Sequence, residues 1–357
     1  MPEDSANCDR YDEKLAEEIR EKAGELGFCR VGFTTMEPFG RVREKVRERA
    51  YPSMFDKLFE VGTEPKDIFP LGKSIIVLAR DYSDIDFPES LLPHIARAYL
   101  SRSYLPIDGS DARTALDAFE AFLMDKGVSF KPDGNVLNMR AAAERAGVIA
   151  FGHNNFAYVP GVGSFVILYG YLVDAALEPA DTPAGGKCPE GCHACIDACP
   201  TKALYAPYKL DIEKCILFNN AIRAMRSDPK QLDVPAELRD GVGVHIHGCD
   251  ECQAACPRNA AALHHKSPRT DPLLEHIAEG FSLDKVLHMP EGYYEEYIYP
   301  IMYNYISDPV LFQRNAAIAM GNSGDRKWIP DLTAELDNES PIVREHVRWA
   351  LDKLQRA

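Results

Sequence analysis

Eight of the ten cysteines lie between residues 188 and 256, in two groups that each end in Cys-Pro, with one further cysteine between the groups. The two groups read Cys188-x3-Cys192-x2-Cys195-x3-Cys199-Pro and Cys249-x2-Cys252-x3-Cys256-Pro. Thiolates are soft ligands that suit iron–sulfur clusters and zinc. In bacterial ferredoxins, three closely spaced cysteines bind one cubane, and the cysteine before the proline binds the other. The spacing therefore predicts two 4Fe–4S clusters.

This exchange of the fourth ligand divides the eight cysteines into two interlocking sets. Cluster one is assigned to Cys188, Cys192, Cys195 and Cys256, and cluster two to Cys199, Cys215, Cys249 and Cys252. A pair of zinc ribbons is the alternative, but zinc sites usually lack the x3-Cys-Pro ending. One residue more than the ferredoxin spacing separates Cys188 from Cys192, which leaves the ligand count unchanged and can reshape that loop. The remaining cysteines, Cys8 and Cys29, belong to neither set and are expected to be packing or surface residues.

The composition favours a protein that does not bind nucleic acid non-specifically. The 357 residues carry a formal net charge of -15, with 55 acidic and 40 basic side chains. Non-specific nucleic-acid binding depends on Lys and Arg neutralising phosphates. There is no apolar run long enough to cross a bilayer, and the first residues show neither a basic leader nor a twin-arginine signal. We therefore expect a cytoplasmic protein, in which structural disulfides are rare.

Hydrophobic periodicity predicts helices and strands that alternate through the first half of the chain. Helices are predicted at 12–26, 115–127 and 136–147, and strands at 27–34, 73–82 and 164–173. This alternation predicts one α/β domain over 1–180, followed by a Pro/Gly-rich linker at 178–187 and the cysteine region. Residues 308–355 show a helical period broken twice by loops, a pattern that resembles HEAT-type hairpins. The predicted domains are 1–180, 181–262 and 263–357.

Several stretches, taken in order, resemble epoxyqueuosine reductases. They include "CHACIDACPTKALYAPYKLDIEKCILFNNA", "GCDECQAACPRN", "RNAAIAMGNSGD", "IFPLGKSIIVLARDY" and "GSFVILYGYLVDAALEP". That family uses cobalamin and two 4Fe–4S clusters to remove the epoxide oxygen of a tRNA nucleoside, and it shares its catalytic core with reductive dehalogenases. The resemblance covers nearly the whole chain. It implies a reductive-dehalogenase or nitroreductase-like α/β domain, a ferredoxin-like double-cluster domain and C-terminal HEAT-like hairpins.

The register of the family places its proton-donating aspartate at Asp133, in "FKPDGNVLNMR". A protonated carboxyl beside a reduced corrinoid could donate to the departing oxygen. The alternative is an ordinary turn aspartate, because Asp-Gly is a common loop signal.

The resemblance also implies corrinoid contacts. They fall on Tyr104, Arg140, His153, Asn154, Ser164 and Asp250. The chain departs from the family at several of these places: "GHN" at 152–154 replaces "GKN", "RSYL" at 102–105 replaces "RDYH", and "GNV" at 134–136 replaces an apolar-proline stretch. Basic residues of the first HEAT-like helices are replaced by "YIYPIMYNYISDP" at 297–309. His153 is then either a lower-face or substrate contact or a pocket histidine with satisfied hydrogen bonds.

The resemblance implies a corrinoid-dependent iron–sulfur reductase that acts on epoxyqueuosine in tRNA, with electrons from a reduced ferredoxin or a flavodoxin-type donor. The acidic charge and the lost basic residues favour a first alternative, a related reductase or dehalogenase of a small molecule. A second alternative is an electron-transfer or corrinoid-activating protein without a substrate pocket. The run 257–269, with Arg258, His264, His265, Lys266 and Arg269, is the candidate phosphate-binding patch or else a solvated loop.

Overall fold

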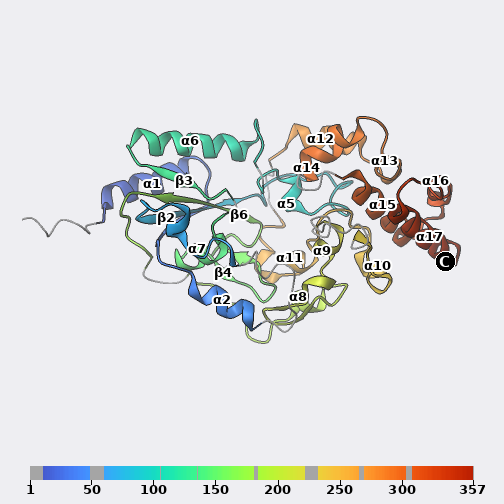
Figure 1. Ribbon diagram of the computed structural model, residues 1–357, viewed down its shortest axis with the longest axis horizontal. Helices are drawn as coiled ribbons and strands as arrows, with labels where there is room; N and C mark the ends of the chain where they lie inside the picture. Colours follow the sequence, from blue (N-terminus) through green and yellow to red (C-terminus); the bar gives the residue numbers. More distant parts are fainter. Residues whose placement is uncertain are drawn as a thin grey trace, which may run out of the picture. The chain divides into compact units, whose positions relative to one another are not determined.

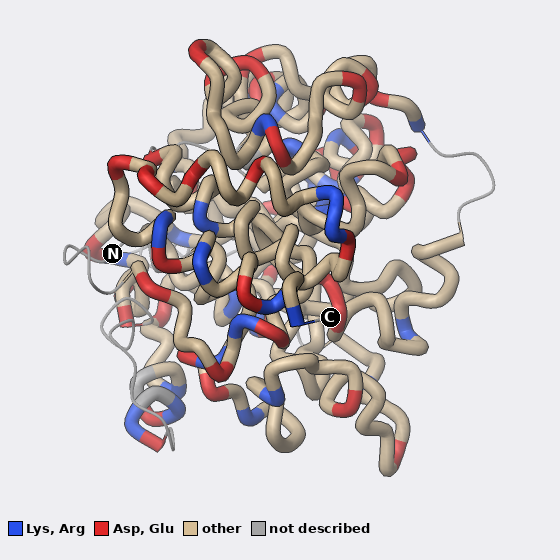
Figure 2. Tube along the Cα trace, turned by 90° about the vertical axis from the view of Figure 1, so that its right-hand side faces the viewer, with Lys and Arg blue, Asp and Glu red and all other residues tan. Residues whose placement is uncertain are grey.

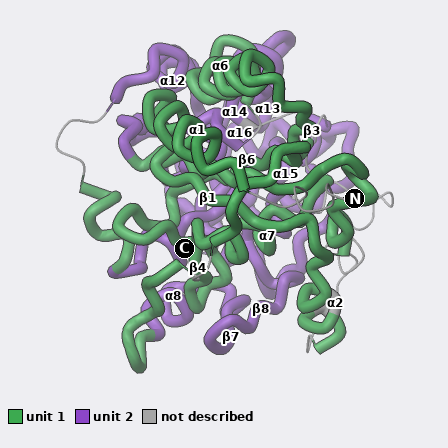
Figure 3. The backbone as a smooth tube through the Cα atoms, turned by 90° about the vertical axis from the view of Figure 1, so that its left-hand side faces the viewer, with its two compact units in different colours: residues 1–83, 106–192, 258–264 green, residues 84–105, 193–257, 265–357 purple. Residues whose placement is uncertain are grey.

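The computed structural model describes residues 11–48, 60–104, 106–134, 136–180, 184–221, 232–264, 269–302 and 308–356. The chain forms two compact units built from interleaved segments (Figure 3). The first unit comprises 1–83, 106–192 and 258–264, and the second comprises 84–105, 193–257 and 265–357. The three domain ranges expected from the sequence stay a prediction.

A four-stranded antiparallel sheet lies at the centre of the first unit, in the order β1-β2-β6-β3. Its strands are β1 (Arg30–Thr35), β2 (Ser74–Asp81), β3 (Phe130–Pro132) and β6 (Val166–Val173). The first six residues of β2 are buried, which explains the nearly continuous apolar run in the sequence. The predicted strands at 27–34, 73–82 and 164–173 are confirmed, although β1 begins three residues later than expected.

Helices cover both faces of this sheet (Figure 1). On one face, α1 (Glu13–Glu25) and α6 (Asp111–Asp125) bury residues such as Ile19 and Phe119. On the other face, α7 (Met139–Arg145) packs its alanines against the sheet. Because successive strand residues point to opposite faces, Ile76 contributes to the first core and Val77 to the second.

Capping residues decide where the two later helices of this unit begin. Ser110 Oγ accepts the Arg113 N–H at 3.2 Å, so α6 begins before the predicted residue 115. Asn138 Oδ1 accepts the Ala141 N–H at 3.3 Å, so α7 begins three residues after the predicted 136. Short elements complete the unit. They are α2 (Gly40–Arg47), α4 (Pro65–Ile68), β4 (Ala150–Phe151) and β5 (Ala157–Tyr158).

The second unit is mostly helical and contains the hairpin β7 (Leu204–Ala206) and β8 (Lys209–Leu210). Its short helices are α5 (Arg97–Leu100), α8 (Ala194–Asp197), η1 (Ile212–Lys214), α9 (Ile216–Asn220), α10 (Ala236–Val242) and α11 (Glu251–Ala254). The 3-10 turn η4 (Pro257–Asn259) follows at the boundary of the two units. The C-terminal helices are α12 (Pro272–Gly280), α13 (Leu283–His288), η5 (Tyr294–Ile298), α14 (Tyr299–Met302), α15 (Pro309–Ser323), η6 (Arg326–Trp328), α16 (Ile329–Ala334) and α17 (Pro341–Arg356).

Helix α15 is the most buried of these C-terminal helices and packs against α13 and α17. Gly321 allows α17 to approach, because a Cβ at that position would lie 2.9 Å from Ala350. The predicted helical character of the C-terminal region is confirmed, whereas its HEAT-type pairing stays a prediction. None of the helices in the described ranges has the length and apolar character needed to span a membrane.

We expect a buried histidine of α17 to make the protein sensitive to acid. His346 is fully buried, and it donates from Nδ1 to the Ile342 carbonyl at 2.8 Å. Burial lowers its pKa to about 3, below the value of about 6.5 for a histidine in the unfolded chain. At pH values between these two pKa values, the unfolded state binds a proton that the folded state does not. Stability is therefore lost as the pH falls below about 6.5, by up to about 2 kcal/mol at pH 5.

Anaerobic melting temperatures at pH 7 and pH 5 check this expectation. His346→Gln should melt lower than the wild type at pH 7 but show a smaller difference between the two pH values. An unchanged difference in the variant would assign the acid sensitivity to other groups.

Candidate functional site

Four cysteines that the sequence assigns to cluster two lie together in the second unit. Cys199 follows α8, Cys215 precedes α9, Cys249 lies just before α11 and Cys252 lies in it. Cys199 is buried in an apolar cluster with Cys195, and both Cys215 and Cys252 pack against that cluster. The predicted ligands therefore meet from three separate stretches of chain.

The electrostatics of these cysteines fit a positively charged metal centre. The pKa of Cys252 is raised well above its usual value, first by burial and then by the neighbouring thiolates of Cys249, Cys215, Cys199 and Cys195. Burial also raises the pKa of Cys215. Buried thiolates that repel one another need a nearby cation to remain charged, and the iron atoms of a cluster would supply that charge. The thiolate donor set therefore fits the predicted 4Fe–4S cluster.

The described residues do not present the ligand geometry of a single bound ion. Within those ranges, no three or more His, Cys, Asp or Glu side chains are arranged to hold one metal ion. The four cysteines of a cubane bind different iron atoms, so their sulfur atoms need not converge on one point.

Two cysteines of the cluster-one set, Cys188 and Cys192, belong to the first unit and are held by His153. The His153 backbone N–H donates to Cys188 Sγ at 3.3 Å. Its ring Nδ1 lies 2.9 Å from the Cys192 carbonyl, which can only accept, so Nδ1 carries the proton. In the second unit, Cys195 and Cys256 are both buried. His153 thus spans the loop in which the sequence carries one residue more than the ferredoxin spacing.

We expect His153→Ala to lose iron faster than the wild type, because the ring no longer holds the Cys192 carbonyl. Residues that orient metal ligands typically change metal affinity by about 10- to 100-fold, and the retained backbone bond to Cys188 favours the lower end. His153→Asn, which places a donor near the position of Nδ1, should retain more iron. The decay of cluster absorbance in the presence of a chelator measures the rates. Equal rates for the wild type and His153→Ala would contradict this role.

Asp133 lies in a turn directly after β3, at the edge of the sheet. Its backbone N–H donates to the Gly170 carbonyl at 2.8 Å, and its Oδ1 accepts the Leu137 N–H at 2.8 Å. The following Gly134 has a φ of 53°, a conformation that favours glycine. The side chain is half-buried. The turn expected from "DG" is therefore present, and the role of Asp133 as a proton donor stays a prediction.

Three other residues predicted to contact the corrinoid lie in the first unit. Asn154 and Ser164 are buried. Asn154 Nδ2 donates to the Tyr158 hydroxyl at 3.0 Å, and Ser164 exchanges two 2.8 Å hydrogen bonds with the Asn259 side chain. Arg140 is exposed as a residue, but its guanidinium donates to the Asn155 carbonyl and lies over the Phe151 ring, 4.8 Å from the centroid. All three residues thus have local structural partners, and they stay predicted corrinoid contacts.

Tyr104 and Asp250 belong to the second unit. Tyr104 is 45% exposed and meets the Tyr99 ring edge-on, with 5.9 Å between the ring centroids. Asp250 Oδ2 accepts the Arg97 backbone N–H at 2.8 Å and its guanidinium Nη1 at 3.2 Å. Asp250 therefore anchors the start of α5, in addition to its predicted contact.

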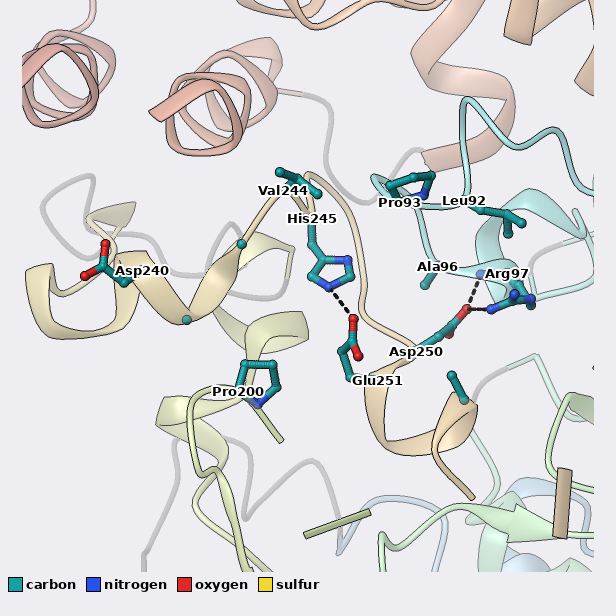
Figure 4. A pocket seen from close by; sticks show the side chains of 13 residues that line it. Leu92, Pro93, Ala96, Arg97, Pro200, Asp240, Val244, His245, Asp250 and Glu251 are labelled. Carbon is teal, nitrogen blue, oxygen red and sulfur yellow. Dashed lines mark hydrogen bonds and ion pairs between the residues drawn. The ribbon is translucent and has the colours of Figure 1, made fainter. Parts of the chain in front are cut away.

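A pocket of about 380 Å³ in the second unit adjoins the segments that carry the cluster-two cysteines (Figure 4). It is lined by Leu92, Pro93, Ala96, Arg97, Pro200, Asp240, Gly241, Gly243, Val244, His245, Asp250, Glu251 and Ala254. His245 Nε2 lies 3.2 Å from Glu251 Oε1, and this pairing lowers the pKa of Glu251. This pair was not predicted from the sequence, although "HIHGCDEC" places His245 and Glu251 on either side of Cys249.

Similarity to known proteins supports the assignment of a double-cluster domain. Residues 187–259 match the family described as a 4Fe-4S double cluster binding domain, which confirms the domain predicted from the cysteine spacing. Over 96% of its length, the chain is 30% identical to an epoxyqueuosine reductase of Bacillus cereus, of which it covers 90%.

Two solved structures are similar over 96% of this chain and 90% of theirs. An epoxyqueuosine reductase with a tRNA-Tyr epoxyqueuosine-modified tRNA stem loop has a TM-score of 0.75 and 27% identity. The Bacillus subtilis epoxyqueuosine reductase, with its catalytic aspartate loop swung out of the active site, has a TM-score of 0.75 and 29% identity. This chain belongs to the epoxyqueuosine reductase family.

Proposed function

We propose that this protein reduces epoxyqueuosine to queuosine in tRNA. The observation that carries the proposal is the similarity over 96% of the chain to a reductase structure containing an epoxyqueuosine-modified tRNA stem loop. The reaction removes one oxygen: two electrons and two protons convert the epoxide into an alkene and water. The protein must therefore deliver electrons, place the epoxide and supply protons.

The eight cysteines would hold two 4Fe–4S clusters in the sets assigned from the sequence. Cys199, Cys215, Cys249 and Cys252 hold cluster two, and Cys188, Cys192, Cys195 and Cys256 hold cluster one. When bound, the clusters pass single electrons, and cobalamin supplies a centre able to complete a two-electron reduction. Cobalamin is implied by the family resemblance, with contacts at the six predicted residues. A ferredoxin or flavodoxin-type protein is the proposed electron donor.

Asp133 is the proposed proton donor to the departing epoxide oxygen. It lies on a turn after β3, and the B. subtilis relative has a catalytic aspartate loop that moves out of its active site. One carboxyl oxygen can keep the Leu137 N–H bond while the other carries the proton. The turn would thus fix the direction of the carboxyl and still allow proton transfer.

The charge of the protein limits where tRNA could bind. Acidic residues outnumber basic ones, and both signs occur throughout the trace (Figure 2). Within the basic run 257–269, Arg258 stacks on Tyr158 at 4.0 Å and Arg269 pairs with Asp84 at 3.1 Å. His265 and Lys266 lie outside the described residues. This run stays the proposed phosphate contact, and activity on tRNA should fall as salt is raised.

The test is an anaerobic assay of protein loaded with clusters and cobalamin. A modified stem loop should lose one oxygen, as measured by mass spectrometry after nuclease digestion. An untouched stem loop, together with reduction of a small epoxide or halogenated compound, would favour the small-molecule alternative that the acidic charge supports. The paramagnetic resonance signal of cobalamin measures its binding, and a failure to bind would favour the electron-carrier alternative.

A further inference from the structure

Helix α15 carries two polar residues, Arg314 and Asn315, whose side chains are completely buried. Burial of an arginine is costly unless its donors are hydrogen-bonded. Here the donors reach main-chain carbonyls of other segments of the second unit. Several of those carbonyls belong to segments that adjoin cluster-two cysteines, which indicates a role for the two residues.

Asn315 bonds to two of the three chain segments that carry cluster-two cysteines. Its Nδ2 donates to the Asn220 carbonyl at 2.7 Å and to the Ile246 carbonyl at 2.8 Å. Asn220 ends the helix that begins after Cys215, and Ile246 lies three residues before Cys249. One amide group therefore fixes the spacing between two stretches that are distant in sequence.

Arg314 orients the Asn315 amide and also bonds to two further main-chain carbonyls. Its Nε donates to Asn315 Oδ1 at 3.0 Å, which turns the Asn315 NH2 group toward the carbonyls. Its guanidinium also donates to the Asn219 carbonyl at 2.7 Å and to the Leu232 carbonyl. A buried polar network whose donors are satisfied in this way specifies one arrangement of the chain.

Two asparagines of α9 extend the network to the ligand segments themselves. Asn219 Nδ2 donates to the Cys215 carbonyl at 2.9 Å. Asn220 Oδ1 accepts the Gly248 N–H at 3.1 Å, and its Nδ2 donates to the Gly248 carbonyl at 2.9 Å. The contacts thus run from α15 to the backbone of Cys215 and to the residue before Cys249.

We propose that Arg314 and Asn315 are positioning residues of cluster two, so that helix α15 of the C-terminal region is a structural part of the electron-transfer centre. The proposal rests on the cluster-two ligand set of the proposed function. Cys215 is distant in sequence from Cys249 and Cys252. Its segment is held beside theirs by side chains that a ferredoxin module of residues 187–259 alone does not contain.

A second contact on the same helix supports this role. Asn322 lies seven residues, about two turns, after Asn315. Its Nδ2 donates to the Arg239 and Gly243 carbonyls, each at 2.8 Å. The stretch 243–246 before Cys249 is therefore held at both ends by amides of α15.

Asn315→Asp tests the proposal with little change of shape. The variant keeps an oxygen that accepts from Arg314. It replaces the Nδ2 donor with a second carboxylate oxygen, which cannot donate to the Asn220 and Ile246 carbonyls and is repelled by them. Gln313→Glu is the matched control, because Gln313 lies on the same helix and donates to the Leu287 carbonyl at 2.8 Å, away from the cluster segments. We expect anaerobically purified Asn315→Asp to hold about four iron atoms, and Gln313→Glu about eight like the wild type.

Paramagnetic resonance with redox titration should show that Asn315→Asp has lost the signal of one cluster and retained the other. If Asn315→Asp does not fold, Asn322→Asp is the second variant, and we expect it to keep its iron but to shift the midpoint potential of one cluster. Full iron and unchanged potentials in the folded variants would overturn the proposal, as would equal iron loss in Gln313→Glu. A wild-type protein without about eight iron atoms would instead overturn the ligand assignment.

Discussion

Asp133→Asn protein should bind cobalamin and the modified stem loop normally and yet turn over about 100- to 10,000-fold more slowly than the wild type. The amide cannot readily donate a proton to the departing oxygen. Its oxygen can still accept the Leu137 N–H that the carboxylate accepts at 2.8 Å, so the turn after β3 should persist. The loss should therefore appear in kcat and leave KM nearly unchanged.

Asp174→Asn is the matched control for this variant. Asp174 follows β6, and its Oδ1 accepts the Ser129 N–H at 2.9 Å, so it also uses a carboxylate to hold a turn of the first unit. Single-turnover assays with pre-reduced protein should show normal rates for Asp174→Asn. A fully active Asp133→Asn would keep the reductase and discard Asp133 as the proton donor.

Cys252→Ser should reduce the iron content from about eight to about four atoms per chain and abolish turnover with a protein electron donor. Serine is a hard ligand that stays protonated, and it cannot replace a soft thiolate. The effect should be confined to cluster two, because the cysteine spacing assigns Cys252 to that set. Iron and sulfide analysis of anaerobic protein measures the loss.

Cys29→Ser serves as the control for cysteine replacement. Cys29 is exposed, and its Sγ donates to the Ala79 carbonyl at 3.3 Å, a bond that a serine hydroxyl can also make. Its iron content should remain about eight. Cys8 is outside the described residues, and its replacement is also expected to leave the iron content unchanged. Halved iron in Cys29→Ser, or full iron in Cys252→Ser, would show that the ligand sets are wrong.

Local pattern was enough to predict three strands of the sheet and the helices that pack on it, but not β3, after which Asp133 lies, or the short helices beside the cysteines. The apolar run at 73–82 is a strand because its residues are buried against helices on both faces of the sheet. The boundaries were less predictable, because they depend on caps such as Asn138, whose side chain selects the first turn of α7. The eight cysteines were recognisable because cluster ligands need a fixed residue type at a fixed spacing.

Contacts between distant segments could not be predicted in the same way. "RNAAIAM" has the pattern of an apolar helix, and nothing local shows that Arg314 and Asn315 point into the interior toward the carbonyls of 219, 220 and 246. The grouping of 84–105 with the second unit is equally non-local. His153 was identified as a residue of interest, yet its contact with Cys192 joins residues 39 positions apart in the sequence.

The interleaving of the two units sets the order of events during protein synthesis. The first unit extends to Cys192 and is resumed only at Arg258, with Asn259 supplying the partner of Ser164. At about 5–20 residues per second, a ribosome needs roughly 3–13 s for the intervening stretch. That stretch holds six of the eight cluster cysteines, and the other two, Cys188 and Cys192, lie within the five residues before it. Every cluster ligand is therefore translated before the segment 258–264 that completes the first unit.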